Sequence, residues 1–528
     1  MMYDVHPPRV LIVGGGLVGL SAALFLQHQG VSAALVERRR GTSPQPKARR
    51  INIRTMELFR QAGIAEEVLE AARGLAAHQA MAAGPTLAQA RQLPFTLPGG
   101  IPQWDTLTPA PACLCAQDLL EPTLRRLAER RGCDLRFDTE CVEFTEDTTG
   151  IEAVLRAGDG TVERLRADYL IAADGAASPI RERLGIARSG RGTLGRAVNV
   201  YFRADLRELV RGREFNLCQI ENDSVPGTFA SVDGEFRWIF TTGEGVDRPA
   251  ERWPEALRTA IGAPGLDVEL LSVLPWESGM FVADRYRSGR VFLAGDAAHV
   301  MPPYAAAGAN TGIQDAHNLA WKLAHVLHGA AGEALLDSYH AERHPIGWYT
   351  ADQSSVRIAN LRALNTESTD GTPLADPIAL ILGARCHSAA VIDDGSPHTM
   401  TRLDLAGQPG TRLPHHFLPG GRSALDLVDT RCALLIGPDG RAWRAQEAPV
   451  EVHEMDETWC TAAGLTRSGA LLVRPDQIVA WRSPALPADP GSALRSALDR
   501  ILDRGIPASP GAGRRSSVGA MPDSPAAQ

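Results

Sequence analysis

Apolar residues recur in two different rhythms along this chain. In residues 1–185, strand-like runs such as RVLIV and ADYLIAA alternate with helical segments, which is typical of a doubly wound α/β sheet. Between 186 and 284, apolar and polar residues alternate singly, as in VNVYF, which predicts an antiparallel sheet with one covered face. The first rhythm returns over 285–365, in RVFLAG and in apolar positions at helical spacing from Ile313 to Leu323. The pattern predicts an α/β fold in which one parallel-sheet domain is split by an inserted antiparallel domain.

The last part of the chain forms a separate pattern. A stretch rich in Pro and Gly, about 366–415, precedes strand-like segments such as CALLIGPD and ALLVRPDQIVAW, which predict a C-terminal domain over 400–505. Residues 506–528 are rich in Gly, Pro, Ser and Ala and have no apolar face, so we expect a disordered tail.

A glycine-rich turn follows the first predicted strand and opens the first predicted helix. Gly14 allows a tight turn, Gly16 lets the backbone approach a pyrophosphate, and Gly19 lets helix and strand pack closely. Unpaired N–H groups at the helix N-terminus suit phosphate oxygens. Glu37, at the end of the next apolar strand, can accept hydrogen bonds from a ribose 2′-OH, which argues against a 2′-phosphorylated nucleotide. The turn therefore predicts a Rossmann-like site for NAD or FAD.

Composition narrows the classes of partner. With 528 residues and a hydrophobic share of 44%, the chain is expected to form about three globular domains. A net charge of −8 gives no footprint for nucleic acid, and the RRR run at 38–40 is interpreted as a solvated face or a phosphate clamp. We find no apolar run of membrane-spanning length and no signal-peptide pattern, so we expect a cytoplasmic protein without a membrane partner. The eight cysteines lack CxxC and metal-ligand spacing, so we expect reduced thiols and no metal.

Four motifs together carry a family resemblance. They are the glycine-rich turn with Glu37, Asp174-Gly175 at a strand end, GDAAH at 295–299, and PPYAAAGANTG at 302–312. They resemble the FAD-dependent aromatic hydroxylases of the para-hydroxybenzoate hydroxylase type, and the finer similarity is to the tetracenomycin oxygenase type that modifies aromatic polyketides. The resemblance covers about residues 8–350, and the C-terminal region is similar to the thioredoxin-like domain of related hydroxylases.

The resemblance implies an enzyme and its reaction. FAD would be the cofactor, NADPH or NADH a transient co-substrate, and a flavin C4a-hydroperoxide would hydroxylate a small polycyclic aromatic substrate with oxygen from O2. A Baeyer–Villiger-type or multi-step oxygenation on the same scaffold stays open. A flavin halogenase is disfavoured because we find no GWxWxIP-like motif, and a non-catalytic flavoprotein is a third alternative. The C-terminal domain has no CxxC, so we expect packing or dimerisation there; monomer and homodimer both stay open.

The resemblance also implies roles for single residues. Asp296 would hold the ribityl hydroxyls, and Lys47, where the family commonly has Arg, would lie near the pyrophosphate without the bidentate fork. Asp174, with Arg181 as its expected ion-pair partner, would serve both FAD and nicotinamide binding. His299 is interpreted as structural, because the flavin carries out the oxygen chemistry. The full predicted FAD-binding set is Gly14, Gly16, Leu17, Val18, Gly19, Glu37, Arg38, Lys47, Gln117, Cys141, Asp174, Asp296, Pro303, Gly308, Ala309, Asn310 and Thr311.

The segment PPYAAAGANTG is expected to border the flavin ring. Asn310 and Thr311 would open a helix that begins near Ile313, with its N–H groups directed at the pyrimidine edge. The family commonly has at least one glycine where Ala305 and Ala306 stand, so the two methyl groups are expected to alter this loop. No catalytic base is assigned. Pro303 and Tyr304 are expected to flank the reactive flavin carbon, and the predicted substrate-cavity residues are Tyr304, Phe202, Trp238 and Trp276.

Overall fold

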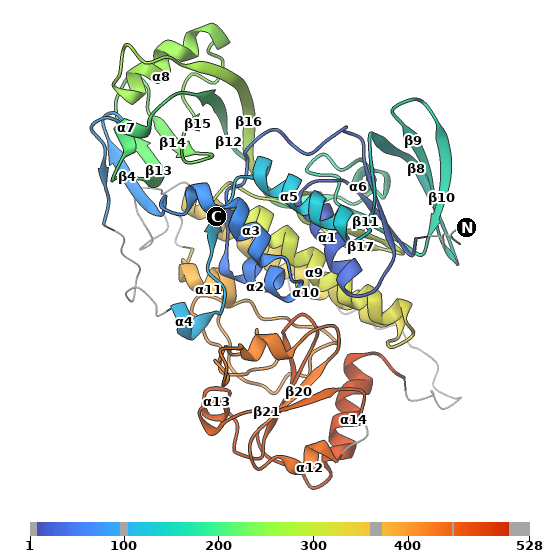
Figure 1. The fold of residues 1–528 in the computed structure, drawn as a ribbon. Helices are drawn as coiled ribbons and strands as arrows, with labels where there is room; N and C mark the ends of the chain where they lie inside the picture. The colour runs from blue at the N-terminus through green and yellow to red at the C-terminus, as the bar shows by residue number, and fades with distance from the viewer. Residues whose placement is uncertain (1–7, 95–103, 359–371, 446–447, 506–528) are drawn as a thin grey trace, which may run out of the picture.

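A parallel sheet forms the centre of the molecule (Figure 1). The computed structural model describes residues 8–94, 104–358, 372–445 and 448–505. The strand order is β17-β18-β11-β1-β2-β7, and all neighbours are parallel except β17 and β18. Because both faces of this sheet are covered, its inner strands are apolar and buried almost throughout. The six strands are β1 (Val10–Val13), β2 (Ala33–Glu37), β7 (Asp134–Phe137), β11 (Tyr169–Ala172), β17 (Arg287–Ser288) and β18 (Val291–Leu293).

Long helices cover the parallel sheet and deliver the predicted motifs to it. Helix α1 (Leu17–His28) packs against β1, β2, α5 (Gln117–Arg130) and α9 (Ala307–Leu327), and α9 packs against α10 (Asp337–Ile358). The expected start of α9 near Ile313 is wrong, because the helix already begins at Ala307. None of the helices in the described ranges is both long and apolar enough to cross a membrane.

The chain leaves the parallel sheet after β11 and returns beside it at β18. The segment between these two strands supplies five strands of an eight-stranded sheet, here called the middle sheet, whose order is β19-β16-β12-β15-β14-β13-β4-β5. The sheet also recruits β4, β5 and β19, which lie outside the range 186–284 expected for it. The strands are β4 (Ala80–Gly84), β5 (Arg91–Gln92), β12 (Arg188–Arg203), β13 (Phe215–Ile220), β14 (Gly227–Ser231), β15 (Arg237–Thr242), β16 (Glu269–Ala283) and β19 (His299–Val300).

The single alternation of β12 and β15 places two predicted substrate residues on the outer face of the middle sheet. Phe202 and Trp238 are fully buried and pack in one core with Trp253 and Leu257 of α8 (Trp253–Ile261). The prediction that they line the substrate cavity is therefore wrong, because α8 covers this face of the sheet. The opposite face carries Tyr201 and its neighbours, described below.

Smaller sheets complete the fold. An antiparallel sheet of β8 (Thr139–Asp147), β9 (Gly150–Ala157) and β10 (Val162–Ala167) connects β7 to β11. The C-terminal sheet has the order β21-β20-β22-β23 and lies in Figure 1 below α2 (Ile53–Gln61) and α10, in orange and red. Its elements are β20 (Ala433–Ile436), β21 (Glu451–Glu454), α13 (Glu457–Ala462), β22 (Ala470–Val473), β23 (Val479–Ser483) and α14 (Pro490–Ile501).

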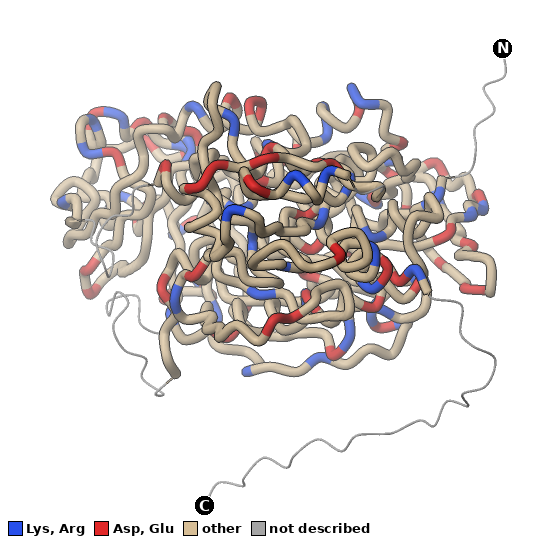
Figure 2. The backbone as a smooth tube through the Cα atoms, turned by 90° about the horizontal axis from the view of Figure 1, so that it is seen from below, with Lys and Arg blue, Asp and Glu red and all other residues tan. Residues whose placement is uncertain are grey.

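The C-terminal domain docks on the parallel-sheet domain through a buried apolar cluster and a buried ionic cluster. Trp321 of α9 belongs to the same apolar cluster as Leu434 and Leu498. A buried ionic cluster joins Arg474 to Glu342 of α10 at Nη1–Oε1 2.6 Å. Figure 2 shows the positions of Lys and Arg interspersed along the backbone with those of Asp and Glu over the described part of the chain.

Candidate functional site

The glycine-rich turn has the geometry that its spacing predicts. Gly14 has φ +114°, and a Cβ there would lie 2.2 Å from the carbonyl oxygen of Ala173. A Cβ on Gly19 would lie 1.8 Å from the Gly14 oxygen, so helix α1 could not approach β1 with any larger residue. At Gly16 the nearest atom, Glu121 Oε1, is 3.5 Å from the Cβ position. The backbone at Gly16 is therefore open to a ligand, while the other two glycines are required by packing.

Glu37 is held beside this turn. Its Oε2 accepts a hydrogen bond from the Gly15 N–H at 2.7 Å, and its Oε1 accepts one from the Arg39 N–H at 2.9 Å. A Cβ on Gly15 would lie 2.7 Å from the Glu37 Cβ, so Gly15 is also required, which its sequence position did not indicate. The half-buried carboxylate keeps further lone pairs that can accept ribose hydroxyls.

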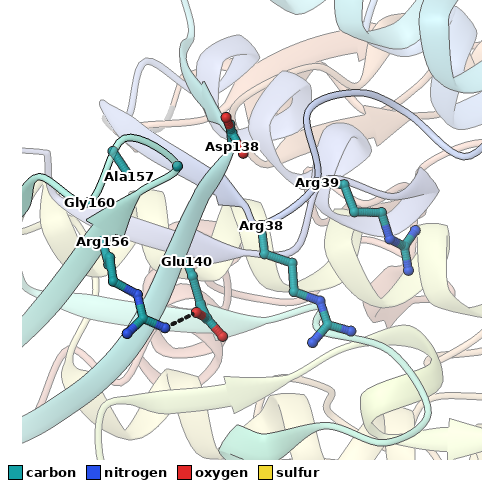
Figure 3. Close-up of a pocket in the computed structure, with 8 residues that line it drawn as sticks. Arg38, Arg39, Asp138, Glu140, Arg156, Ala157 and Gly160 are labelled. Carbon is teal, nitrogen blue, oxygen red and sulfur yellow. Dashed lines mark hydrogen bonds and ion pairs between the residues drawn. The ribbon is translucent and has the colours of Figure 1, made fainter.

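A surface pocket of about 520 Å³ lies beyond the end of β2 (Figure 3). Arg38 and Arg39 line it from the end of β2, and an ion pair between Arg156 of β9 and Glu140 of β8, at 2.6 Å, lines it from the neighbouring antiparallel sheet. Arg38 is exposed and directly follows Glu37 at the end of β2. The pocket is polar and mixed in charge, with Asp138 completing its described ionisable lining.

The GD turn brings three segments into contact. Gly295 has φ +62°, and a Cβ there would lie 2.7 Å from Val18 of α1. A Cβ on Gly312 of α9 would lie 2.6 Å from the same side chain. Asp296 follows this contact, and its side chain is exposed. Desolvation raises the pKa of its carboxyl group, whereas the charges of His299 and Lys47 lower it. Because the charge of Lys47 acts on the Asp296 carboxyl group, the structure places the two side chains in the same region.

Asp174 lies at the end of β11, but the expected ion pair with Arg181 is not formed. Its Oδ2 accepts the Ile180 N–H at 3.1 Å, burial raises its pKa, and its buried Oδ1 has no partner among the described residues. Arg181 instead donates to the carbonyls of Ala177, at 2.9 Å, and Ala297, at 3.2 Å. Arg181 therefore ties the turn after β11 to the GD turn, because backbone carbonyls satisfy its guanidinium.

Cys141 of β8 is half-buried, and the charges of Arg183 and Asp174 both act on its thiol. Burial raises the pKa of this thiol to about 11, so it is neutral near pH 7. Cys141 therefore lies near the carboxylate of Asp174 at the end of β11.

Helix α9 opens in a left-handed turn. Ala305 has φ +48° and Ala306, the residue before the helix, has φ +54°, a region that costs an alanine about 1–2 kcal/mol. The Ala307 N–H bonds the Tyr304 carbonyl at 2.9 Å. The N–H groups of Gly308 and Ala309, in contrast, find no acceptor within the described ranges. The free donors of this helix end are therefore those two residues.

Asn310 and Thr311 lie inside the first turns of α9 rather than at its start, and both are buried. Asn310 Oδ1 accepts the Asn52 N–H at 2.9 Å, and its Nδ2 donates to the Arg50 and Ala306 carbonyls, each at 2.9 Å. The Thr311 carbonyl accepts from the Arg343 guanidinium at 3.3 Å. These two residues fix the loop, while Gly308 and Ala309 present donors.

Gln117 begins α5 and is tied to the segment that carries Lys47. Its Oε1 accepts the Ala48 N–H at 3.3 Å, and its Nε2 donates to Glu121 Oε1 at 2.7 Å. Glu121 is almost fully buried, and its Oε2 accepts the Ser43 N–H at 2.7 Å. The sequence reasoning missed Glu121, although its i, i+4 position relative to Gln117 could have indicated it.

Tyr304 is held by a residue that the sequence reasoning did not find. The Arg357 guanidinium donates to its hydroxyl at 3.4 Å and lies 5.3 Å from its ring centroid, while Pro303 beside it is exposed. Arg357 is buried at the end of α10. Helix α10 therefore fixes the direction of Tyr304.

The inner face of the middle sheet lies against the parallel-sheet domain. Tyr201 and Ile239 cluster with Ala116, which precedes α5. Trp276 lies on the same face, where its Nε1 donates to Asn199 Oδ1 at 3.1 Å. Of the three aromatic residues predicted on this sheet, the structure therefore places only Trp276 on the inner face.

His299 belongs to a fully buried network. Its Nε2 lies 2.6 Å from Asp315 Oδ2, and Arg343 Nε donates to Asp315 Oδ1 at 2.8 Å. Burial would raise the pKa of Asp315, but the charges of His299 and Arg343 outweigh it and the pKa is lowered. Asp315 also accepts the Gly295 N–H at 3.2 Å, so His299 supports the GD turn from behind.

Comparison with known proteins identifies the family. Residues 8–354 match the family model described as FAD binding domain, and residues 406–505 match aromatic-ring hydroxylase, C-terminal. The chain belongs to the FAD-dependent aromatic hydroxylases. It is accordingly an FAD-dependent aromatic monooxygenase, as the motifs indicated.

Several relatives cover almost the whole chain. Tetracenomycin A2 monooxygenase-dioxygenase of Streptomyces glaucescens is 44% identical, over 94% of this chain and 97% of that protein. The 4-methyl-5-nitrocatechol 5-monooxygenase of Burkholderia sp is 40% identical, over 95% and 98%. Among solved structures, aklavinone-11 hydroxylase with FAD and aklavinone has a TM-score of 0.87 at 34% identity, covering 95% of this chain and all of that one.

Proposed function

We propose that this chain is a single-component NAD(P)H- and FAD-dependent monooxygenase that hydroxylates a polycyclic aromatic, polyketide-derived substrate. The observation that carries the proposal is the contact of three segments at Val18. There the segment after the glycine-rich turn, the GD turn and the first turns of α9 meet, so that N–H donors and carboxylates suited to FAD lie on three converging segments.

The residues fit this cofactor from end to end. Glu37 would accept the adenosine ribose, the open backbone at Gly16 would take the pyrophosphate, and Asp296 would hold the ribityl hydroxyls. The unpaired N–H groups of Gly308 and Ala309 would bind the pyrimidine oxygen. When bound, FAD supplies the activation of O2 and the transfer of one oxygen atom, which no side chain can provide.

The protein's own part would be to orient the substrate and exclude water. Tyr304 is the residue that best meets these needs, because it follows Pro303 and is fixed by Arg357. On the opposite side, Trp276 and Tyr201 of the middle sheet would bound the cavity in place of Phe202 and Trp238. Relatives are named for tetracenomycin A2 and for aklavinone, and these names support a polycyclic substrate.

A second candidate is a multi-step oxygenation on the same scaffold. Two relatives carry the name monooxygenase-dioxygenase, the second being the tetracenomycin B2 enzyme of Streptomyces olivaceus at 42% identity. A Baeyer–Villiger-type reaction would use the same cofactor and the same site, and it would insert its oxygen atom into a carbon–carbon bond of the ring system. These reactions differ in the number of oxygen atoms that enter the product and in whether a ring carbon bond is broken.

One experiment tests the proposal and separates a single oxygenation from a multi-step one. The purified chain is denatured, the released chromophore is identified by chromatography, and the native protein is incubated with polycyclic phenols, O2 and either NADPH or NADH. We expect FAD, substrate-stimulated oxidation of one nicotinamide nucleotide, and a product heavier by one oxygen atom. FMN or no flavin would refute the cofactor assignment, and a gain of two or more oxygen atoms would favour the second candidate.

A further inference from the structure

Two rows of side chains cross the inner face of the middle sheet. The first, here called the packed row, pairs in register across β16, β12, β15 and β14 and consists of Ser272, Tyr201, Ile239 and Ala230. Tyr201, Ile239 and Ala230 are only 7–8% exposed, and Ser272 Oγ accepts a hydrogen bond from Gln45 Nε2 at 3.1 Å. The packed row is therefore a line along which the sheet contacts the parallel-sheet domain.

The next row on the same face, here called the open row, is more accessible. Its members pair in register across β16, β12, β15, β14 and β13, and they are Leu274, Asn199, Thr241, Thr228 and Gln219. All five are half-buried or exposed, and none is charged. The side chains of Thr228 and Gln219 make no hydrogen bond with any residue in the described ranges. Uncharged polar groups without protein partners therefore lie directly beside the domain contact.

Asn199 belongs to the open row, and the orientation of its amide is fixed. Its Oδ1 accepts hydrogen bonds from Trp276 Nε1 at 3.1 Å and from Thr241 Oγ1 at 2.9 Å. Because an indole N–H can only donate, the amide atom that it contacts must be the oxygen. The two N–H groups of Asn199 Nδ2 find no acceptor among the described residues. Asn199 therefore presents a pair of free donors on the inner face.

This arrangement favours an uncharged ligand that carries an acceptor oxygen. A half-buried amide N–H without a partner gains free energy when an acceptor binds it. A charged ligand would lose hydration, and no side chain of the open row offers a compensating charge. At the β16 end of the row, Leu274 and the half-buried ring of Trp276 add apolar area that suits flat fused rings. A carbonyl group on a polycyclic ring system meets these requirements.

We propose that Asn199 Nδ2 donates to a carbonyl oxygen of an uncharged polycyclic substrate, and that Asn199 thereby determines specificity and orientation. The inference rests on the proposed function and adds a contact where the substrate lies against the sheet. Trp276 and Thr241 are positioning residues, because they hold the Asn199 oxygen and so direct its N–H groups. No covalent bond changes on binding.

The test uses the FAD-loaded enzyme and two tricyclic probes, fluorenone and fluorene, in which a carbonyl group and a methylene group occupy the same place. Equilibrium dialysis measures both affinities, and infrared difference spectroscopy records the carbonyl stretching band of bound fluorenone. The main variant is Asn199→Asp, which keeps the accepting oxygen and loses the donor pair. Asn222→Asp is the matched control, because Asn222 lies in the loop after β13 and its Oδ1 accepts the Ser224 and Val225 N–H groups, as Asp also can.

In the wild type and in Asn222→Asp we expect the carbonyl band of bound fluorenone at lower wavenumber than in an aprotic solvent, because a hydrogen bond weakens the carbonyl bond. In Asn199→Asp the band should return to higher wavenumber. The affinity for fluorenone relative to fluorene should fall about two- to tenfold, the ratio that one neutral hydrogen bond provides. Thr241→Val should lose part of both effects, because it removes one of the two donors that orient the amide. FAD content and thermal unfolding should be unchanged in Asn199→Asp, because a merely structural role would alter them instead.

Either of two results would overturn the proposal. One is a wild type that binds neither probe; the other is an Asn199→Asp variant that keeps both the carbonyl band and the probe preference of the wild type. Failure of the proposed function is distinct, since it would appear as missing FAD or as FAD that neither NADPH nor NADH reduces. An enzyme that binds and reduces FAD but recognises fluorenone without Asn199 refutes only the assignment of this residue.

Discussion

Arg474→Met is expected to destabilise the docking of the C-terminal domain. Arg474 is fully buried; it donates to Glu342 at 2.6 and 2.9 Å and to Asp476 at 2.6 and 3.0 Å. Lys322 of α9 donates to the same Glu342 at 2.8 Å. The four groups carry two positive and two negative charges, so their cluster is neutral. Methionine fills a similar length but leaves one negative charge without compensation.

The magnitude follows from burial. Glu342 and Lys322 are 0% exposed and the Asp476 side chain is 4% exposed, so solvent cannot screen the unpaired charge. Removing one partner of such a buried pair costs about 3–5 kcal/mol. The matched control is Arg467→Met, whose ion pairs to Asp439 and Glu457 are exposed and screened by solvent, so that their loss is expected to change stability little.

The loss of stability in Arg474→Met is also expected to depend on pH, in a direction that follows from the pKa of Glu342. Burial would raise the pKa of Glu342, but Arg474 and Lys322 outweigh it and hold the pKa well below its ordinary value. In the wild type this group therefore stabilises the fold above its unfolded pKa, and the contribution is lost as pH falls through the folded pKa. Without Arg474 we expect a raised pKa for one carboxyl of the cluster, so the deficit of the variant should shrink as pH falls below 7.

Urea unfolding followed by circular dichroism, at pH 7 and pH 5, measures both effects. Adding Glu342→Gln to Arg474→Met should cost about 0.5–3 kcal/mol less than the sum of the single losses, because the two residues interact directly. A loss no greater than that of Arg467→Met, or a deficit that grows toward pH 5, would refute the electrostatic reasoning.

Three further changes test other parts of the structure. Asp296→Ala should weaken FAD binding by about 1.5–3 kcal/mol, the value of a hydrogen bond to a charged group, and unchanged affinity in a flavin fluorescence titration would contradict the ribityl role. Ala305→Gly or Ala306→Gly should raise the free energy of unfolding by about 0.5–1 kcal/mol, because relief of left-handed strain exceeds the added entropy of the unfolded chain; thermal unfolding would show a lower midpoint if the strain were absent. Burial lowers the pKa of His317 from 6.5 to about 3. The contribution of its neutral form to stability is therefore complete above pH 6.5, and the free energy of unfolding falls by up to about 1.4 kcal/mol per pH unit as the pH decreases toward 3. His317→Gln should flatten that part of the stability curve.

The strands, the turns and the FAD cofactor could be predicted from local sequence. The spacing of Gly14, Gly16 and Gly19 is a property of a single strand–turn–helix unit, so the residue types and their spacing sufficed to predict its geometry. The same holds for Glu37 and for the GD turn, because each follows one apolar strand. The match of residues 8–354 to an FAD binding domain agrees with this prediction.

Single alternation could not assign the faces of the middle sheet. Phe202 and Tyr201 are neighbours in β12, and the pattern indicates that they point to opposite sides without indicating which side meets the cofactor. That depends on α8, which covers the Phe202 face, and on Ala116, which contacts the Tyr201 face. Only the packing of distant segments decides it.

The same limit applies to charged partners. Arg181 was expected to pair with Asp174 seven positions away, yet it bonds the Ala297 carbonyl, which the GD turn brings to it. Glu342 and Arg474 are far apart in the chain and meet because α10 and the C-terminal domain share a buried interface. A buried charge is stable only beside an opposite charge or hydrogen-bonding groups. When those groups are distant in sequence, only the tertiary structure identifies them.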